Sequence, residues 1–128
     1  LNGSIGTLPG TDSPGMAKYS EIAAAAGFKP GPFSMESYDA AALILLAMEA
    51  TKSTDSQVYK YAIDEIANAP GEVIYPGELG KALDLLKTGK DIDYVGASAV
   101  ELVGGGESAG NYAIMEVIDG KNVPVSYK

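Results

Sequence analysis

"YDAAALILLAMEAT", Tyr38 to Thr51, is the stretch that decides the fold class. The pattern predicts a helix from Ser37 or Tyr38 to about Thr51 that is apolar nearly all round. Its longest apolar run, Ala40 to Met48, is far shorter than the roughly 20 residues that a membrane span needs. A solvent-facing helix would carry a polar face, so we expect other elements to cover this helix on more than one side, as in layered α/β proteins.

Three further helices are predicted around this one. Asp12 or Ser13 is the expected cap of a helix that begins near Pro14 and ends at Gly27. The spacing of Thr54-Asp55-Ser56-Gln57 is that of a capping box, which predicts a helix to about Asn68. The last amphipathic helix is expected over Gly77–Thr88.

Strands are predicted at the start of the chain and at its end. Short extended pieces are expected at Ser4–Thr7 and Val73–Tyr75. After residue 96 the apolar residues alternate, which indicates strands at Val100–Val103, Tyr112–Ile118 and Val123–Ser126. Asp119-Gly120 is a two-residue hairpin signal, and Pro124 marks the last strand as an edge strand. The fold class is therefore α/β, with about four helices followed by antiparallel strands.

The composition removes several classes of function. The 128 residues contain no Cys, His, Trp or Arg, and the formal net charge is −8. Without Cys or His, ordinary zinc, copper or haem sites and Cys–His or Ser–His nucleophiles are excluded, and we expect no cofactor. Without Arg there is no bidentate fork for phosphate. The negative charge disfavours nucleic acid and anionic membranes as partners.

Gly104-Gly105-Gly106-Glu107-Ser108-Ala109 fits the G-x-G-x-x-G/A pattern of a dinucleotide-binding turn. Such a turn has to open a helix whose amino end faces the pyrophosphate. Here the following segment, "NYAIMEV", alternates like a strand. We therefore predict a surface turn between two strands, where glycine permits positive φ.

Other motifs do not support an enzyme. Gly96-Ala97-Ser98 resembles the start of a nucleophile elbow, but the chain has no His to activate Ser98. Asp91 and Asp93 have the types needed for paired carboxylates, yet a solvated polar connector explains them better.

Four segments, taken in order, resemble a known family. They are "GTLPGTDSPGMAKY" (6–19), "PFSMESYDAAALILLAMEATKSTDSQ" (32–57), "PGEVIYPGELGKALDLLKTGKDIDYVGAS" (70–98) and "NYAIMEVIDGKNVPV" (111–125). Together they resemble the carboxy-terminal part of periplasmic solute-binding proteins of ABC transporters, of the branched-chain amino-acid (Leu/Ile/Val) type. After "GAS" the family often has Gly-Pro and then Phe-Asp-x-x-Gly-Asp. This chain has a stretch one residue shorter without the Pro, which leaves its conformation open.

The resemblance implies a partial type I periplasmic-binding-protein fold, in which two α/β lobes close around a ligand. It implies a second-lobe and hinge segment at about 1–30, first-lobe helices at about 33–95, and hinge and terminal strands at about 96–128. Gly3–Gly6 is the implied hinge region. As a fragment of roughly the last third, the chain would lack most of the cleft and bind no ligand tightly. It would also expose apolar faces such as Ala40–Met48, which self-association would cover.

The resemblance also implies a role. The protein would be a periplasmic, non-enzymatic ligand-binding component that delivers an amino acid to an ABC permease. Phe33 is the implied ligand-binding residue, and its other interpretation is a hydrophobic anchor for its loop. A different class is a sensor of amides, urea or amino acids on the same fold. A small enzyme is disfavoured by the missing His, Cys and Arg.

Overall fold

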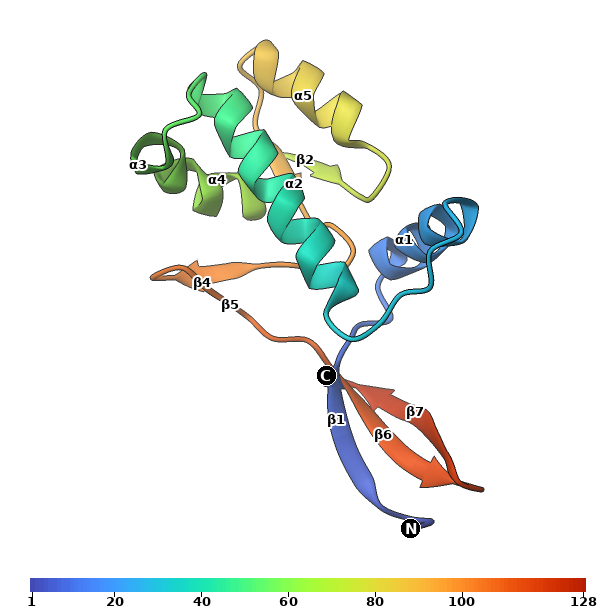
Figure 1. Ribbon diagram of the computed structural model, residues 1–128. Coiled ribbons are helices and arrows are strands. Elements are labelled where there is room, and N and C mark those ends of the chain that lie inside the picture. The colour runs from blue at the N-terminus through green and yellow to red at the C-terminus, as the bar shows by residue number, and fades with distance from the viewer.

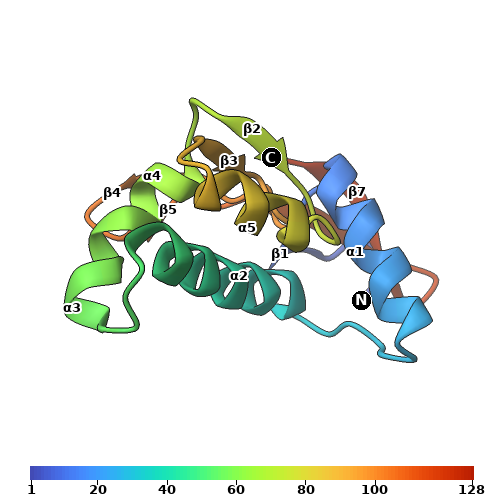
Figure 2. The ribbon, with the colours of Figure 1, turned by 90° about the horizontal axis from the view of Figure 1, so that it is seen from above.

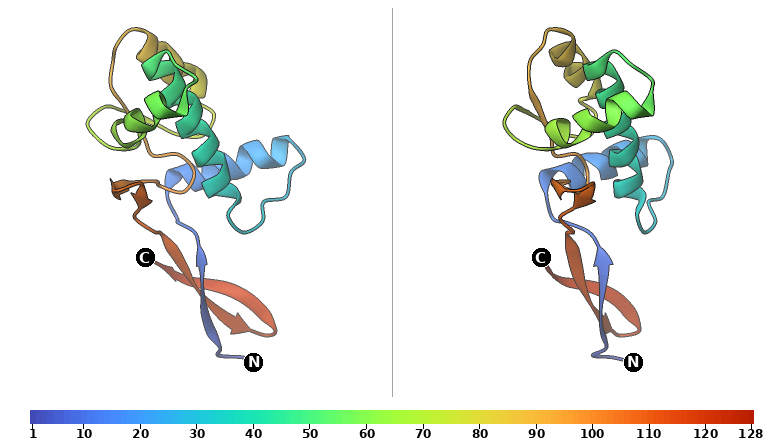
Figure 3. Two further views of the ribbon diagram at one scale, coloured as in Figure 1. Left: turned by 60° about the vertical axis from the view of Figure 1, so that its left-hand side comes forward. Right: turned by 90° about the vertical axis from the view of Figure 1, so that its left-hand side faces the viewer.

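The computed structural model describes all residues from Leu1 to Lys128, and it contains a helical body and a separate three-stranded sheet (Figure 1). The sheet projects away from the helices in the side views of Figures 1 and 3. After one opening strand, helices dominate the chain as far as residue 87 and antiparallel strands follow from residue 102, so the predicted α/β class is confirmed. None of the helices has the length and apolar character required to cross a membrane.

The projecting sheet has the strand order β1-β6-β7 and is antiparallel throughout. Its strands are β1 (Ile5–Pro9), β6 (Tyr112–Ile118) and β7 (Lys121–Tyr127). The Asp119-Gly120 turn has φ of 51° and 73°, as the hairpin signal predicts for a turn that matches the strand twist. Pro124 lies in the edge strand β7, where a missing N–H faces outward. Both predictions for this hairpin are confirmed.

The helical body is built around α2 (Ser34–Thr51), which lies beside α5 (Leu79–Lys87) in Figure 2. Behind them β2 (Glu72–Ile74) pairs in parallel with β3 (Ile92–Tyr94). One apolar cluster fills the space between these elements; its buried members include Leu46, Ala47, Ile66, Ile74, Ala82, Ile92 and Tyr94. We did not predict this parallel pair, because the three residues of β3 follow the charged Lys90 and Asp91 and carry an Asp at their centre.

The first helix, α1 (Pro14–Ala25), ends where the sequence predicts. Gly27 has φ of 68°, its N–H donates to Ala24 O, and the N–H of Phe28 donates to Ala23 O, which is a Schellman ending. At the other end the predicted side-chain cap is wrong. Ser13 occupies the N-cap position, but its buried hydroxyl has no hydrogen-bond partner.

The helix predicted over residues 54–68 is broken into pieces: α3 (Ser56–Tyr59), a 3₁₀ turn η1 (Lys60–Ala62) and α4 (Ile63–Ala67). Its cap is Asp55, whose carboxylate accepts the N–H of Gln57 at 2.8 Å, one residue later than the predicted capping box. Ile66 in α4 is buried, whereas Val58 in α3 is 45% exposed.

The expectation that α2 is covered on more than one side is wrong for this chain. Leu43, Leu46 and Ala47 are buried, while Ile44 and Leu45 on the other side are 38% and 57% exposed. The physical reason is that β2, β3, α4 and α5 all pack on one side of the helix. The exposed side is the apolar face at Ala40–Met48 that was expected to lack a cover.

A pair of short strands lies between β3 and β6. β4 (Leu102–Gly104) and β5 (Glu107–Ser108) pair antiparallel, and Gly104 at the end of β4 and Gly105 and Gly106 in the turn all have positive φ. The predicted surface turn is confirmed, and no helix follows it.

Candidate functional site

A cavity lies where the sheet joins the helical body. The end of β1, the start of α2, the segment after β3 and the segment before β6 meet there. The cavity has a volume of about 180 Å³ and is called the junction cavity below. Its walls are formed by Pro9, Phe33, Glu36, Ser98, Ser108, Ala109, Gly110, Asn111 and Tyr112.

Phe33 lies at this cavity in an unusual backbone conformation. It is the N-cap of α2, with φ of 62°, and it is 60% exposed. Positive φ is uncommon for a bulky residue, so local bonds have to hold it. Its carbonyl accepts the N–H of Ser37 at 3.0 Å and the hydroxyl of Ser37 at 2.8 Å. The role of Phe33 in ligand binding stays a prediction.

Asp39, one turn further along α2, is the most buried charged side chain of the region, with 2% exposed. Its carboxylate accepts the hydroxyl of Tyr94 at 2.9 Å and the N–H of Ala97 at 2.8 Å. It also accepts the N–H of Ser98 at 2.7 Å and the hydroxyl of Ser98 at 2.6 Å. A buried carboxylate without a cation requires such donors, because an unpaired charge in the interior is costly. These bonds fasten the segment after β3 to the start of α2.

Two glycines allow this fastening. Gly96 has φ of 63°, and a Cβ there would overlap the Asp39 carboxylate and the Tyr94 ring. A Cβ on Gly15, in the first turn of α1, would overlap the carbonyl oxygen of Gly96. The start of α1 and the turn at Gly96 therefore touch through their backbones alone.

Asn111 connects the same segment to the sheet. Its side-chain nitrogen Nδ2 donates to the carbonyl oxygens of Ser98 and Ala99, each at 3.1 Å. Its own carbonyl accepts the N–H of Gly10, just after β1, at 3.0 Å. Asn111 thus joins the helical body to both β1 and β6 at one wall of the junction cavity.

Two ionisable groups near this region have shifted pKa values. Burial and the adjacent Asp39 carboxylate raise the pKa of the Tyr94 hydroxyl, so it stays protonated and donates. Burial and then the charge of Glu101 raise the pKa of Asp93. Neither group has a neighbouring acid or base arranged for proton transfer to a substrate, and we assign them structural roles.

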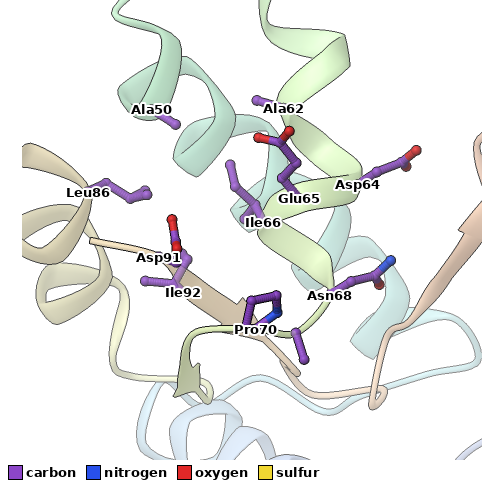
Figure 4. Close-up of a pocket in the computed structure, with 11 residues that line it drawn as sticks. Ala50, Ala62, Asp64, Glu65, Ile66, Asn68, Pro70, Leu86, Asp91 and Ile92 are labelled. Carbon is purple, nitrogen blue, oxygen red and sulfur yellow. The ribbon is translucent and has the colours of Figure 1, made fainter. Parts of the chain in front are cut away.

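A larger cavity, of about 590 Å³, is lined only by residues of the helical body (Figure 4). Figure 4 shows side chains from α2, α4, α5 and β3 around it. Its apolar floor includes Ile66, Leu86 and Ile92, and Asp64, Glu65 and Asp91 line it as well. It contacts none of the residues that join the two parts of the molecule.

Asp91, Asp93 and Ser98, which the sequence disfavours as catalytic residues, do not form a catalytic arrangement in the structure. Asp91 lines this larger cavity while Asp93 lines a different one, so they do not form a carboxylate pair. The polar connector that was predicted for them is wrong, since Ile92 and Tyr94 between and beside them are buried in β3. Ser98 donates its hydroxyl hydrogen to the Asp39 carboxylate, and the chain has no histidine that could activate it.

Sequence reasoning missed the Asp39 network. Its signal was present, because Asp39 is a charged residue directly before the apolar run Ala40–Met48 of this helix. A charge at such a position is rarely buried unless it is paired or hydrogen-bonded, so its burial points to fixed donors.

Comparison with known proteins finds a partial similarity to a substrate-binding protein. The chain is 32% identical over 89 residues to the chemotactic signal transduction system substrate-binding protein BasB of Halobacterium salinarum. The match covers 69% of this chain and only 22% of BasB, so the chain matches about a fifth of that protein's length. No protein family model matches the chain, and no solved structure does.

Proposed function

We propose that this chain is part of a non-enzymatic solute-binding protein, and that a small solute of the amino-acid class binds at the junction cavity. The observation that carries the proposal is the similarity over 89 residues to a protein named as a substrate-binding protein. The position of the cavity supports it, since segments from the sheet and from the helical body both line the cavity.

The arrangement suits a closing movement of two parts around a solute. Only the segments after β1 and before β6 connect the sheet with the helical body, and connections of this kind absorb rotation. A solute that contacts both parts would favour the closed arrangement by the difference in its affinity for the two arrangements. The Asp39 and Asn111 bonds would keep the cavity walls fixed on the helical side.

The finer proposal is a periplasmic component that binds branched-chain or related amino acids for an ABC permease. In this proposal residues 1–30 and 96–128 contribute to the hinge and the second lobe, and residues 33–95 contribute to the first lobe. The Phe33 ring would contact the solute. The support is the family resemblance of the four ordered segments together with the exposed position of Phe33 at the cavity.

A second candidate is a sensor on the same fold that signals to a partner instead of feeding a permease. One observation favours it, because the relative is named for a chemotactic signal transduction system and not for transport. The two candidates share the binding step and differ in the partner that recognises the closed protein.

Titration followed by ¹H–¹⁵N NMR tests the binding step on the chain itself. Leucine, isoleucine, valine, acetamide and urea would be added separately up to millimolar concentrations, where a Kd near 1 mM corresponds to about −4.1 kcal/mol. We expect shifts at Phe33, Ser98 and Asn111. Shifts with the aliphatic amino acids favour the transport candidate, and shifts with acetamide or urea alone favour the sensor.

The two phenylalanines supply a matched pair of variants. Phe33→Ala should abolish the shifts, whereas Phe28→Ala should not, because Phe28 is also exposed, at 53%, but does not line the junction cavity. If no compound of the panel moves these resonances, the proposal fails.

We also propose that the chain associates with itself at high concentration. The exposed side chains Ile44 and Leu45 on α2 and Ile5 and Val125 on the sheet favour this. Light scattering over a concentration series should show a mass above that of the monomer, and a constant monomer mass would contradict it.

A further inference from the structure

The side chains of the junction cavity supply many hydrogen-bond acceptors and few donors. Ser98 Oγ donates its hydrogen to Asp39 Oδ2 at 2.6 Å, and Ser108 Oγ donates to the carbonyl oxygen of Ala109 at 3.2 Å. Asn111 Nδ2 donates to two backbone carbonyl oxygens at 3.1 Å each. The hydrogens of all three side chains are therefore used within the protein, and the hydroxyl of Tyr112 is the remaining side-chain donor of the cavity wall.

The orientation of these groups follows from their partners. Backbone carbonyls only accept, so the amide nitrogen of Asn111 has to face them and its oxygen Oδ1 is left over. The Asp39 carboxylate also accepts the backbone N–H of Ser98, which holds the residue in place at 2.7 Å. What remains unused on these side chains is oxygen lone pairs.

Glu36 adds a negative charge to the same wall. It lies in the first turn of α2 and lines the cavity, and none of the ion pairs of the chain includes it. No lysine lines the cavity, and the chain has no arginine. The Phe33 ring beside it offers an apolar and π-electron surface, which attracts cations as well as alkyl groups.

We infer that the junction cavity binds a group rich in N–H donors, such as an ammonium or a primary amide, and disfavours a carboxylate. The inference rests on the proposed function and specifies which part of the solute enters this cavity. Acceptors whose own hydrogens are already used favour a ligand that supplies hydrogens, and an acceptor group of the ligand would find few donors among these side chains. If the solute is a branched-chain amino acid, its ammonium group and not its alkyl side chain would lie among these residues.

Three probes of similar size test this on the full 128-residue chain: n-butylammonium, butyramide and butyrate. We expect ¹H–¹⁵N titrations at neutral pH to show shifts at Glu36, Ser98 and Asn111 with the first two probes. Their Kd values should be about tenfold lower than that of butyrate, the size of effect expected for a hydrogen-bonding group that is matched and not opposed. Butylammonium binding tighter than butyramide would identify the charged donor as preferred, and the reverse order would identify the amide.

Variants separate the charge of the cavity from its shape. Glu36→Gln should weaken butylammonium about threefold and leave butyramide nearly unchanged, as expected for a partly exposed charge. Glu21→Gln, on the exposed surface of α1, is the control and should change neither Kd. Ser98→Ala should weaken both donor probes; if it unfolds the chain, the Glu36→Gln result still decides.

The inference is overturned if butyrate binds as tightly as the donor probes, or if none of the three moves the cavity resonances. Its failure is distinguishable from failure of the proposed function. Amino acids that shift Phe33 while butyrate equals the donor probes would leave solute binding intact and reject only the donor preference. Absence of shifts with every compound would reject both.

Discussion

The helical body and the projecting sheet are held together in opposite ways. In the body, Leu46, Ile74 and Tyr94 are at most 1% exposed and belong to one apolar cluster. In the sheet, Ala113 is the buried hydrophobic residue, while Ile5, Tyr112 and Val125 are 73%, 46% and 49% exposed. The body is stabilised by burial of side chains and the sheet by backbone hydrogen bonds. A three-stranded sheet with neither face covered is only weakly stable by itself, and packing against another element would stabilise it.

The largest expected effect compares one apolar side chain from each region. Leu46→Ala should lower the free energy of unfolding by about 4 kcal/mol, within the range for buried leucine, because it opens a cavity in the core. Val125→Ala in β7 should cost less than about 0.5 kcal/mol, since the side chain is half exposed. Urea denaturation followed by circular dichroism measures both. Equal losses would show that the sheet is as tightly packed as the body.

A smaller effect is expected at the link between the regions. Asp39→Ala leaves the N–H groups of Ala97 and Ser98 and the Tyr94 hydroxyl without their acceptor, at a cost of about 3 kcal/mol. Hydrogen exchange should then accelerate at residues 97 and 98 more than in the β6–β7 hairpin. The exposed Asp12→Ala is the control, and an unchanged exchange rate at residues 97 and 98 would contradict the fastening role of Asp39.

The smallest effect concerns the pH dependence of the body. Burial and Glu101 raise the folded pKa of Asp93 above its unfolded value near about 3.9. Below that pH the group is protonated in both states and has no effect. As pH rises from the unfolded towards the folded pKa, the carboxylate ionises more readily in the unfolded chain than in the folded one. The free energy of unfolding therefore falls over this range. Asp93→Asn should therefore stabilise the chain by roughly a few tenths of a kcal/mol at pH 7, a small effect because solvent still reaches the half-buried carboxylate, and not at pH 3.

Denaturation midpoints of the Asp93→Asn variant at the two pH values measure this, with Asp12→Asn as the control. A stabilisation that is the same at both values would mean that packing of the amide, and not removal of the charge, is responsible.

The elements that the sequence predicts well depend on local signals. The β6–β7 hairpin has alternating apolar residues and a two-residue turn, and α2 has an unbroken run of helix formers, so both were placed nearly at their observed bounds. Strand β3 was missed because its stability comes from pairing with β2, about 20 residues earlier, and from burial under α2 and α4. Three residues are too few for a periodic pattern.

The candidate site divides in the same way. Phe33 was identified through the family resemblance, and its loop position at the N-cap of α2 is visible from the two prolines before the helix. The Asp39 bonds to Ala97 and Ser98 join residues 58 and 59 positions apart. A pattern of neighbouring residues cannot predict contacts over so many positions. The Asp39 carboxylate, Gly96 and Gly15 come together only in the folded chain.

The exposed ring at position 33 has an optical consequence. The chain contains no tryptophan, so a Phe33→Trp variant would carry a single indole, at the rim of the junction cavity. Phe33 is 60% exposed, so the larger planar ring of tryptophan meets little steric resistance at this position. The emission wavelength of this single tryptophan would depend on the polarity of the cavity rim. It would therefore report whether a solute has displaced water from the rim.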